Sequence, residues 1–171
     1  MAAQGFIARV GGKFKQVLAI LTSAGAADSG KIPALDASGK LDASFMPTGI
    51  GANSAVAVAS EAIAAGKFVN FFSNAGALGM RLADNSNNRE AHGYVTAAVA
   101  SGASGTAYRL NTVNASLTAL TVGTSYYLGL AGGVIAAPLD PAVDIGKTDQ
   151  YLGIAKSATE LVTSEVDAVL L

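Results

Sequence analysis

The sequence contains no cysteine, no tryptophan and a single histidine. The lack of tryptophan removes the side chain best suited to stacking on sugars, and the other two shortages argue against disulfides and metal sites. Without cysteine the 171-residue chain forms no disulfide and offers no thiolate to a metal ion. One histidine argues against a zinc site built on imidazole ligands. No apolar run approaches the roughly 18–20 residues of a transmembrane helix. The apolar stretch at residues 17–21 is shorter than the roughly 7–15-residue core of a secretory signal. We therefore expect no cofactor, no metal site and no membrane partner.

Charged residues are also scarce. They make up 13% of the chain, and the formal net charge is −1. A surface that binds nucleic acid must neutralise several phosphates with lysine and arginine side chains, and no basic patch of that size stands out. The composition therefore predicts no nucleic-acid partner.

The apolar residues that are present are mostly small. Half of the chain (51%) is hydrophobic but only 6% is aromatic, so alanine dominates, with valine, leucine and isoleucine. Apolar burial stabilises a fold by about 25 cal/mol per Å², and each small side chain buries little area. An isolated subunit should therefore have a thin core, and we expect oligomerisation to supplement it.

The residue pattern of the main part of the chain is typical of β-structure. Residues 79–110 alternate strand-like segments with a polar turn at 84–88 and a small-residue turn at 101–105, which predicts a meander. One helical turn is predicted at 60–66. Strands are also predicted at 55–58, 67–72, 80–82, 125–128, 134–137, 150–157, 161–163 and 166–171. Strand spacings of about 8–12 residues predict an all-β fold, a small antiparallel β-barrel or sandwich knob.

The N-terminal part differs in character. Alternating residues flank Gly11-Gly12, the two-residue turn expected of a β-hairpin, and such a hairpin is only marginally stable alone. Residues 31–47 contain two prolines and a turn sequence, which predict an extended arm and not a helix. We divide the chain into 1–50, the hairpin and docking arm, and 51–171, the β-barrel knob domain.

The arm carries the candidate binding residues. A segment of this composition cannot bury its own apolar side chains, so it either stays disordered or lies along a partner surface. The apolar side chains favour docking against a partner or a neighbouring subunit. The predicted binding residues are Phe6, Ile7, Ile32, Leu35, Leu41, Phe45 and Met46.

Candidates for catalysis are weak, and we expect no enzyme. Asp84, Arg89, Glu90 and His92 could form a catalytic cluster, but such a polar turn is more typical of a solvated loop. A glycosidase needs paired carboxylates about 5–9.5 Å apart, whereas the acids of this chain are scattered through turns. The Gly49-Ile50-Gly51 stretch lacks the spaced third glycine and the following helix of a nucleotide-binding loop.

Six stretches of the sequence together carry a resemblance to a known family. They are GKIPALDASGKLDASFMPTGIG, AGKFVNFF, RLAD, AHGYVTAAVASG, LTVGTSYYLGLAGGVIAAP and YLGIAKSATEL. Their pattern resembles the head decoration, or capsid cement, proteins of tailed bacteriophages, in which an N-terminal arm precedes an all-β knob. Related knob domains form the ends of phage fibres.

This resemblance implies a structural virion protein on the capsid exterior. Its arm would bind the major capsid protein, and it would stabilise the shell as a homotrimer. The alternative is the receptor-binding tip of a tail fibre or spike, with recognition in loops 84–90 and 138–147. A fibre needs a long shaft, and the sequence shows no heptads and no long repeat, which favours the capsid.

Overall fold

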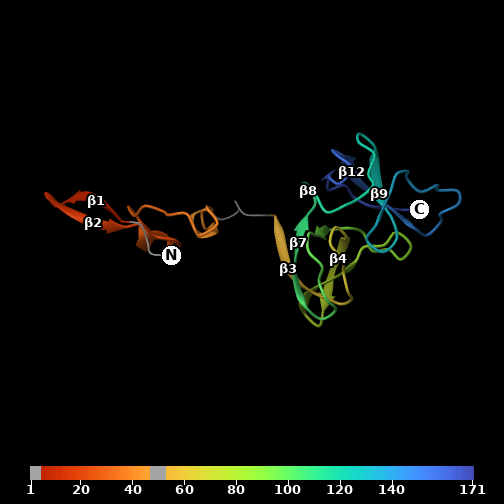
Figure 1. Cartoon of the computed structure of the whole chain (residues 1–171). Helices are drawn as coiled ribbons and strands as arrows, with labels where there is room; N and C mark the ends of the chain where they lie inside the picture. The colour runs from red at the N-terminus through yellow and green to blue at the C-terminus, as the bar shows by residue number, and fades with distance from the viewer. Residues whose placement is uncertain (1–4, 47–52) are drawn as a thin grey trace. The chain divides into compact units, whose positions relative to one another are not determined.

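The computed structural model describes residues 5–46 and 53–171, and the chain divides into two compact units, Met1–Ala52 and Asn53–Leu171. Apart from two short 3-10 helices, every regular element in the described residues is a β-strand (Figure 1). The predicted all-β fold is therefore confirmed. No helix in these two ranges is long and apolar enough to cross a membrane. Pro47 and the Gly49-Ile50-Gly51 stretch lie outside the described residues.

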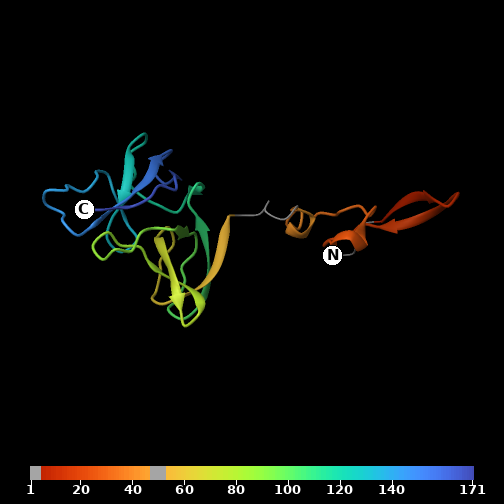
Figure 2. The same ribbon diagram turned by 180° about the vertical axis from the view of Figure 1, so that it is seen from behind.

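The N-terminal unit begins with the predicted hairpin, which Figure 2 shows from behind. Strands β1 (Gly5–Val10) and β2 (Lys13–Leu18) are antiparallel, and Val10 pairs with Lys13 across the turn. Gly11 and Gly12 have φ angles of 59° and 79°. Two successive positive φ angles are what a type I′ turn requires, and only glycine adopts them at little steric cost. The Gly-Gly pair therefore fixes the hairpin's register.

The segment after the hairpin is more folded than an extended arm. The Ile20 N–H donates to the Ile32 carbonyl oxygen (3.0 Å), and the Ala34 N–H donates to the Ile20 carbonyl oxygen (2.8 Å). Further along, the Ser23 N–H donates to Ser44 Oγ at 2.8 Å. These long-range contacts bring residues 20–23 next to 32–34 and 44.

Aspartate side chains explain the turns in this segment, including the 3-10 helices η1 (Gly25–Asp28) and η2 (Ala43–Phe45). Asp28 accepts a hydrogen bond from the Ala24 N–H and pairs with Lys31. Asp36 accepts from two backbone N–H groups of its own turn, and Asp42 accepts from the Ser44 N–H. Aspartates that bond nearby backbone groups in this way favour turns over extended chain.

The first half of the body is a closed five-stranded barrel. Around it the strands run in the order β3 (Ser54–Ala59), β5 (Ala77–Leu82), β4 (Phe68–Asn74), β6 (Gly93–Val95) and β7 (Ser104–Arg109). The β3–β5 pair is parallel and the other pairs are antiparallel. Strands β3, β4 and β7 are labelled in Figure 1.

The predicted meander is wrong at one step, because β4 lies between β5 and β6. The tight turn at Ala75 and Gly76, both with positive φ, pairs β5 with one edge of β4. The other edge of β4 then accepts β6. The following pairing of β6 with β7 is antiparallel, as a meander requires.

Apolar side chains fill the barrel, and one of them comes from a predicted helical turn. The helical turn predicted at 60–66 is absent, because Ile63 and Val99 exchange backbone hydrogen bonds of 2.9 and 2.8 Å as an isolated bridge. This extended pairing excludes a helix there and places Ile63 in the core. The buried cluster comprises Ala57, Ala59, Ile63, Val69, Met80, Val95, Val99 and Ala107.

The second half of the body is a five-stranded antiparallel sheet. Its strand order is β10 (Val134–Ile135), β9 (Ser125–Leu128), β12 (Tyr151–Ala155), β13 (Leu161–Thr163) and β8 (Val113–Asn114). The predicted β9–β10 and β12–β13 hairpins are confirmed. The chain's last strand, β14 (Val169–Leu170), does not close this sheet, because β8 already occupies the edge of β13. It pairs with β11 (Thr148–Asp149) instead.

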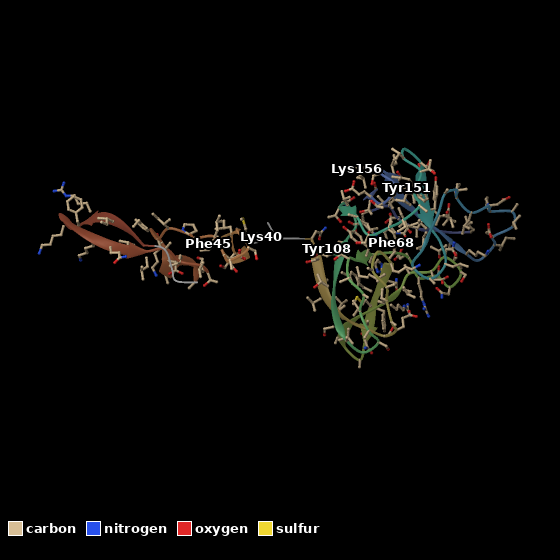
Figure 3. All side chains as sticks on the ribbon, viewed as in Figure 1. Lys40, Phe45, Phe68, Tyr108, Tyr151 and Lys156 are labelled. Atoms are coloured by element: carbon tan, nitrogen blue, oxygen red, sulfur yellow. The ribbon has the colours of Figure 1, made fainter. Side chains whose placement is uncertain are left out.

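A second buried cluster joins the barrel to this sheet. Phe68 from β4 packs edge-on against Tyr94 from β6, with ring centroids 6.1 Å apart, and Figure 3 labels Phe68 within the body. The Tyr94 hydroxyl donates to the Val113 carbonyl oxygen on β8 at 2.8 Å. The cluster comprises Phe68, Ala83, Ala91, Tyr94, Leu110, Leu120, Tyr126, Leu128, Leu152, Ala155 and Leu161.

Candidate functional site

The seven predicted binding residues lie largely on the surface of the N-terminal unit. Ile7 is 74% exposed, and Ile32, Leu35, Leu41 and Met46 are exposed as well. Phe6 and Phe45 are partly buried. The unit thus presents apolar side chains along its whole described length, which is where a docking role requires them.

One face of the hairpin is exposed throughout. Directly paired residues of an antiparallel ribbon project to the same face. The pairs Gly5 with Leu18, Ile7 with Gln16 and Arg9 with Phe14 therefore share one face, which we call the Phe14 face. All six residues are exposed, and Phe14 reaches 80%, the highest value among the large hydrophobic residues described.

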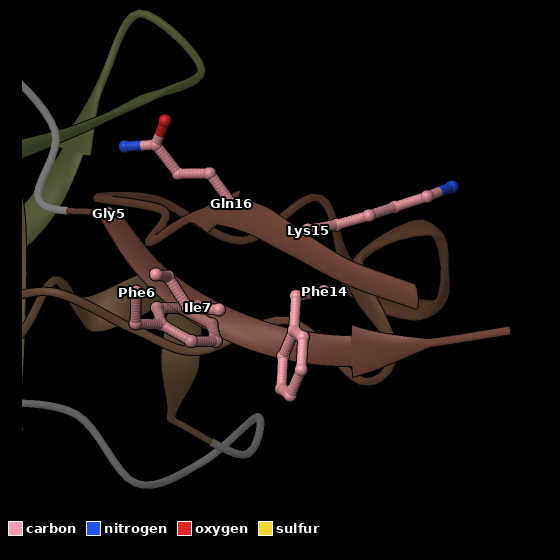
Figure 4. A pocket seen from close by; sticks show the side chains of 6 residues that line it. All are labelled: Gly5, Phe6, Ile7, Phe14, Lys15 and Gln16. Atoms are coloured by element: carbon pink, nitrogen blue, oxygen red, sulfur yellow. The ribbon is translucent and has the colours of Figure 1, made fainter. Parts of the chain in front are cut away.

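A shallow groove of about 490 Å³ adjoins this face (Figure 4). In the figure the Phe14 ring projects from the ribbon, and the Lys15 side chain leaves the ribbon in a different direction. The groove is lined by Gly5, Phe6, Ile7, Phe14, Lys15 and Gln16.

Phe14 and Leu18 belong to this face but were absent from the predicted binding residues. The signal for Phe14 was in the sequence. A two-residue turn at Gly11-Gly12 places residue 14 opposite residue 9, and hence on the face of Ile7. The alternation of Lys13, Phe14 and Lys15 gives the same result, since successive side chains of a strand point to opposite faces.

The hairpin also has two open edges. It contains only β1 and β2, and no third strand pairs with either of them within the described ranges. An unpaired strand edge presents a row of backbone donors and acceptors that another chain can extend. The hairpin therefore offers a strand edge as well as an apolar face.

The polar turn of the body brings two of its four candidate catalytic residues together. His92 Nε2 lies 3.1 Å from Glu90 Oε1, and His92 Nδ1 accepts a hydrogen bond from the Phe71 N–H at 2.9 Å. The imidazole also stacks on the Phe71 ring, with centroids 6.0 Å apart. Both ring nitrogens are thus engaged, and the histidine is held against the barrel wall.

Asp84 and Arg89 hold the turn closed. Asp84 Oδ1 accepts from the Ser86 N–H and hydroxyl, Oδ2 accepts from the Ala131 N–H, and Asp84 and Arg89 bond through their backbones. Burial alone would raise the pKa of Asp84, but these hydrogen bonds and the Arg89 charge outweigh it and lower the pKa. Arg89 Nη1 lies 3.9 Å from Glu61 Oε1.

The four polar residues therefore do not converge on one catalytic point, and the arrangement favours a structural turn. Within residues 5–46 and 53–171, no three His, Asp or Glu side chains are grouped to hold a metal ion.

The second candidate recognition loop, residues 138–147, carries two exposed apolar side chains, Val143 and Ile145. Asp144 accepts hydrogen bonds from the Lys147 ammonium and the Asp140 N–H. These bonds, the lysine's first, lower the pKa of Asp144. Hydrogen bonds within the loop therefore hold its backbone in a turn that exposes both apolar side chains.

No protein-family model matches the sequence, and no curated protein matches it. Among solved structures, the chain is similar to the crystal structure of the N base of head fiber gp8.5 in bacteriophage phi29. The TM-score is 0.43 and the sequence identity 17%, over 65% of this chain and 92% of that chain. A similarity of this size leaves the family unassigned and does not by itself assign a function.

Proposed function

We propose that this chain is a structural virion protein of a tailed bacteriophage. It attaches to the outer surface of the capsid through its N-terminal hairpin and arm, stabilises the shell and catalyses no reaction. The observation that carries the proposal is the run of exposed apolar side chains on the N-terminal unit, with Phe14 and Ile7 the most exposed. The resemblance of the sequence to phage decoration proteins supplies the class of partner.

The exposed residues need a partner for energetic reasons. Covering apolar surface contributes about 25 cal/mol per Å², and a two-stranded hairpin is marginally stable until it packs against something. The body has no such need, because its residues alone form both buried clusters. On this proposal residues 1–50 are the docking part and residues 51–171 are the knob.

Stabilisation of the shell follows from linkage. A ligand that binds only the assembled lattice stabilises it by RT ln(1 + [L]/Kd) per site, about 2.7 kcal/mol at a hundredfold excess over Kd. We further propose a homotrimer, which would hold three N-terminal units at high effective concentration over the shell. Exposed apolar residues of the body could supply its contacts, among them Val143, Ile145, Val169 and Leu170.

The proposal is tested by mixing the purified full-length chain with heads of the encoding phage that lack it, then sedimenting the heads. We expect saturable binding and heads that lose their DNA at a higher temperature once decorated. Light scattering of the unbound protein should give the mass of a trimer. Absence of binding to mature heads would refute the capsid function, and a monomer at micromolar concentration would refute the trimer.

The alternative function, a fibre or spike tip that binds a receptor, is favoured by the exposed Val143 and Ile145 in loop 138–147. Labelled protein would then bind host cells in the absence of particles, and Val143→Ser with Ile145→Ser would abolish that binding. If the protein binds phage heads and does not bind host cells, the result supports the capsid function instead.

A further inference from the structure

Charge is distributed unevenly along the chain. The hairpin, residues 5–18, contains Arg9, Lys13 and Lys15 and no aspartate or glutamate. Residues 53–171 contain six lysines and arginines but nine aspartates and glutamates. Three cations with no carboxylate in the same element thus sit on the hairpin that also exposes Phe14.

The hairpin register shows how these cations surround the apolar residues. Arg9 pairs directly with Phe14 and lies on the Phe14 face. Lys13 and Lys15 flank Phe14 along β2 and point to the opposite face, where Ala8 is the partner of Lys15. All three cationic residues are exposed. The exposed Phe14 and Ile7, which we call the apolar centre, therefore have one cation on their own face. The two lysines can reach around the strand toward them, since lysine side chains are long and flexible.

We infer that the hairpin binds an acidic protein surface of the capsid exterior that has an apolar depression at its centre. The depression receives Phe14 and Ile7, and carboxylates around it face Arg9, Lys13 and Lys15. A strand of the shell can extend the open edge of the hairpin by backbone hydrogen bonds. This inference rests on the proposed function, and it adds the chemistry of the surface that the hairpin recognises.

Three features favour a protein surface over other anionic partners. Three cations are fewer than the four to eight typical of segments that bind anionic lipid, and too few for tight binding to phosphates. An open strand edge matches the backbone of another protein, and neither a lipid nor a nucleic acid offers such a backbone. Aromatic residues, phenylalanine included, and arginine are enriched in interfaces between proteins, and the exposed Phe14 pairs directly with Arg9.

The test compares an exposed lysine of the hairpin with an exposed lysine of the body in the full-length chain. Lys15→Glu reverses a charge on the hairpin, and Lys156→Glu makes the same change on the body, outside the docking part. Binding to undecorated heads is measured at about 50 mM and about 500 mM NaCl, where the Debye length falls from about 14 Å to about 4 Å. Lys15→Glu should weaken binding about two- to twentyfold at low salt and little at high salt, because exposed ion pairs are modest and screened. Lys156→Glu should bind as wild type.

The apolar centre is tested in the same assay. Phe14→Ser should weaken binding about thirtyfold at both salt concentrations, as removal of a hot-spot side chain does. Val122→Ser, which also replaces an exposed apolar residue by serine but on the body, should leave binding unchanged. Lys15→Arg guards against misfolding, because it keeps the charge and should bind as wild type.

The outcomes separate this inference from the proposed function. If wild type binds heads with no salt dependence, or if the Lys15 and Lys156 variants bind alike, the acidic surface is refuted and capsid attachment stands. Self-association of the unbound protein beyond a trimer at low salt, abolished by Lys15→Glu, would show that the hairpin's partner is a second copy. Hairpin-dependent binding to vesicles with about 30% phosphatidylserine, without binding to heads, would overturn both proposals in favour of a membrane surface.

Discussion

Gln150 provides a sharp test of how the two halves of the body are held together. It lies between β11 and β12, and it is almost fully buried. Its Oε1 accepts a hydrogen bond from the Ala91 N–H (2.7 Å), and its Nε2 donates to the Ala91 carbonyl oxygen (3.0 Å). Because Ala91 precedes β6 of the barrel, this one side chain joins the barrel to the sheet through two hydrogen bonds.

Gln150→Leu keeps nearly the same volume but leaves two buried backbone groups of Ala91 without partners. Each such group costs about 1–3 kcal/mol, so the variant should lose about 2–6 kcal/mol of folding free energy. A domain of about 120 residues has an unfolding entropy near 250 cal/mol/K, and the midpoint of thermal unfolding should fall by about 8–24 °C.

Calorimetry or circular dichroism measures this fall, with Gln16→Leu on the exposed hairpin as the matched control. The control should change the unfolding midpoint of the body by less than about 2 °C. An equally small change for Gln150→Leu would refute the assignment, because it would mean that Ala91 finds other partners at no cost.

Three further predictions concern the body. Gly105→Ala should lower the unfolding midpoint by about 4–12 °C, since the added Cβ would lie 2.5 Å from a Val99 methyl group and overpacking costs about 1–3 kcal/mol. Tyr94→Phe should lower it by about 4 °C, because the Val113 carbonyl oxygen loses a donor worth about 1 kcal/mol. Asp84→Asn should flatten the loss of stability in acid. The pKa of Asp84 lies below 3.8, since its hydrogen bonds and nearby cation outweigh the effect of burial. The stabilisation from the Asp84 carboxylate is therefore complete above that pH and disappears as the pH falls through the folded-state pKa. Between about pH 6 and about pH 2, the midpoint of thermal unfolding should therefore fall further for wild type than for the variant.

The sequence predicted the elements of the fold better than their arrangement. The Gly11-Gly12 pair, flanked by alternating residues, was enough to place β1 and β2 in register. The segment 67–72 likewise predicted β4. Local pattern cannot say which edge of a strand is occupied, and this is why the insertion of β4 between β5 and β6 was missed. The same reason explains β14, whose expected edge on the sheet is occupied by β8.

The candidate site was predicted in part. Composition alone indicated that the N-terminal residues could not bury their apolar side chains, and Ile7, Ile32 and Leu35 are indeed exposed. Phe14 was missed because its face becomes clear only when the register of the hairpin is worked through from its turn. The link between Gln150 and Ala91, 59 residues apart, had no signal in the sequence, since glutamine at that position fits a loop equally well.

The central claim is that the chain attaches to the capsid through its N-terminal unit. The most direct measurement is co-sedimentation of the full-length chain and of residues 53–171 with heads that lack the protein. Both buried clusters lie within residues 53–171, so this body should fold alone, which circular dichroism can verify. We predict that the full-length chain saturates the heads and that the folded body does not bind. Decoration of heads by the body alone, at the occupancy of the full-length chain, would contradict the account and place the binding surface on the knob.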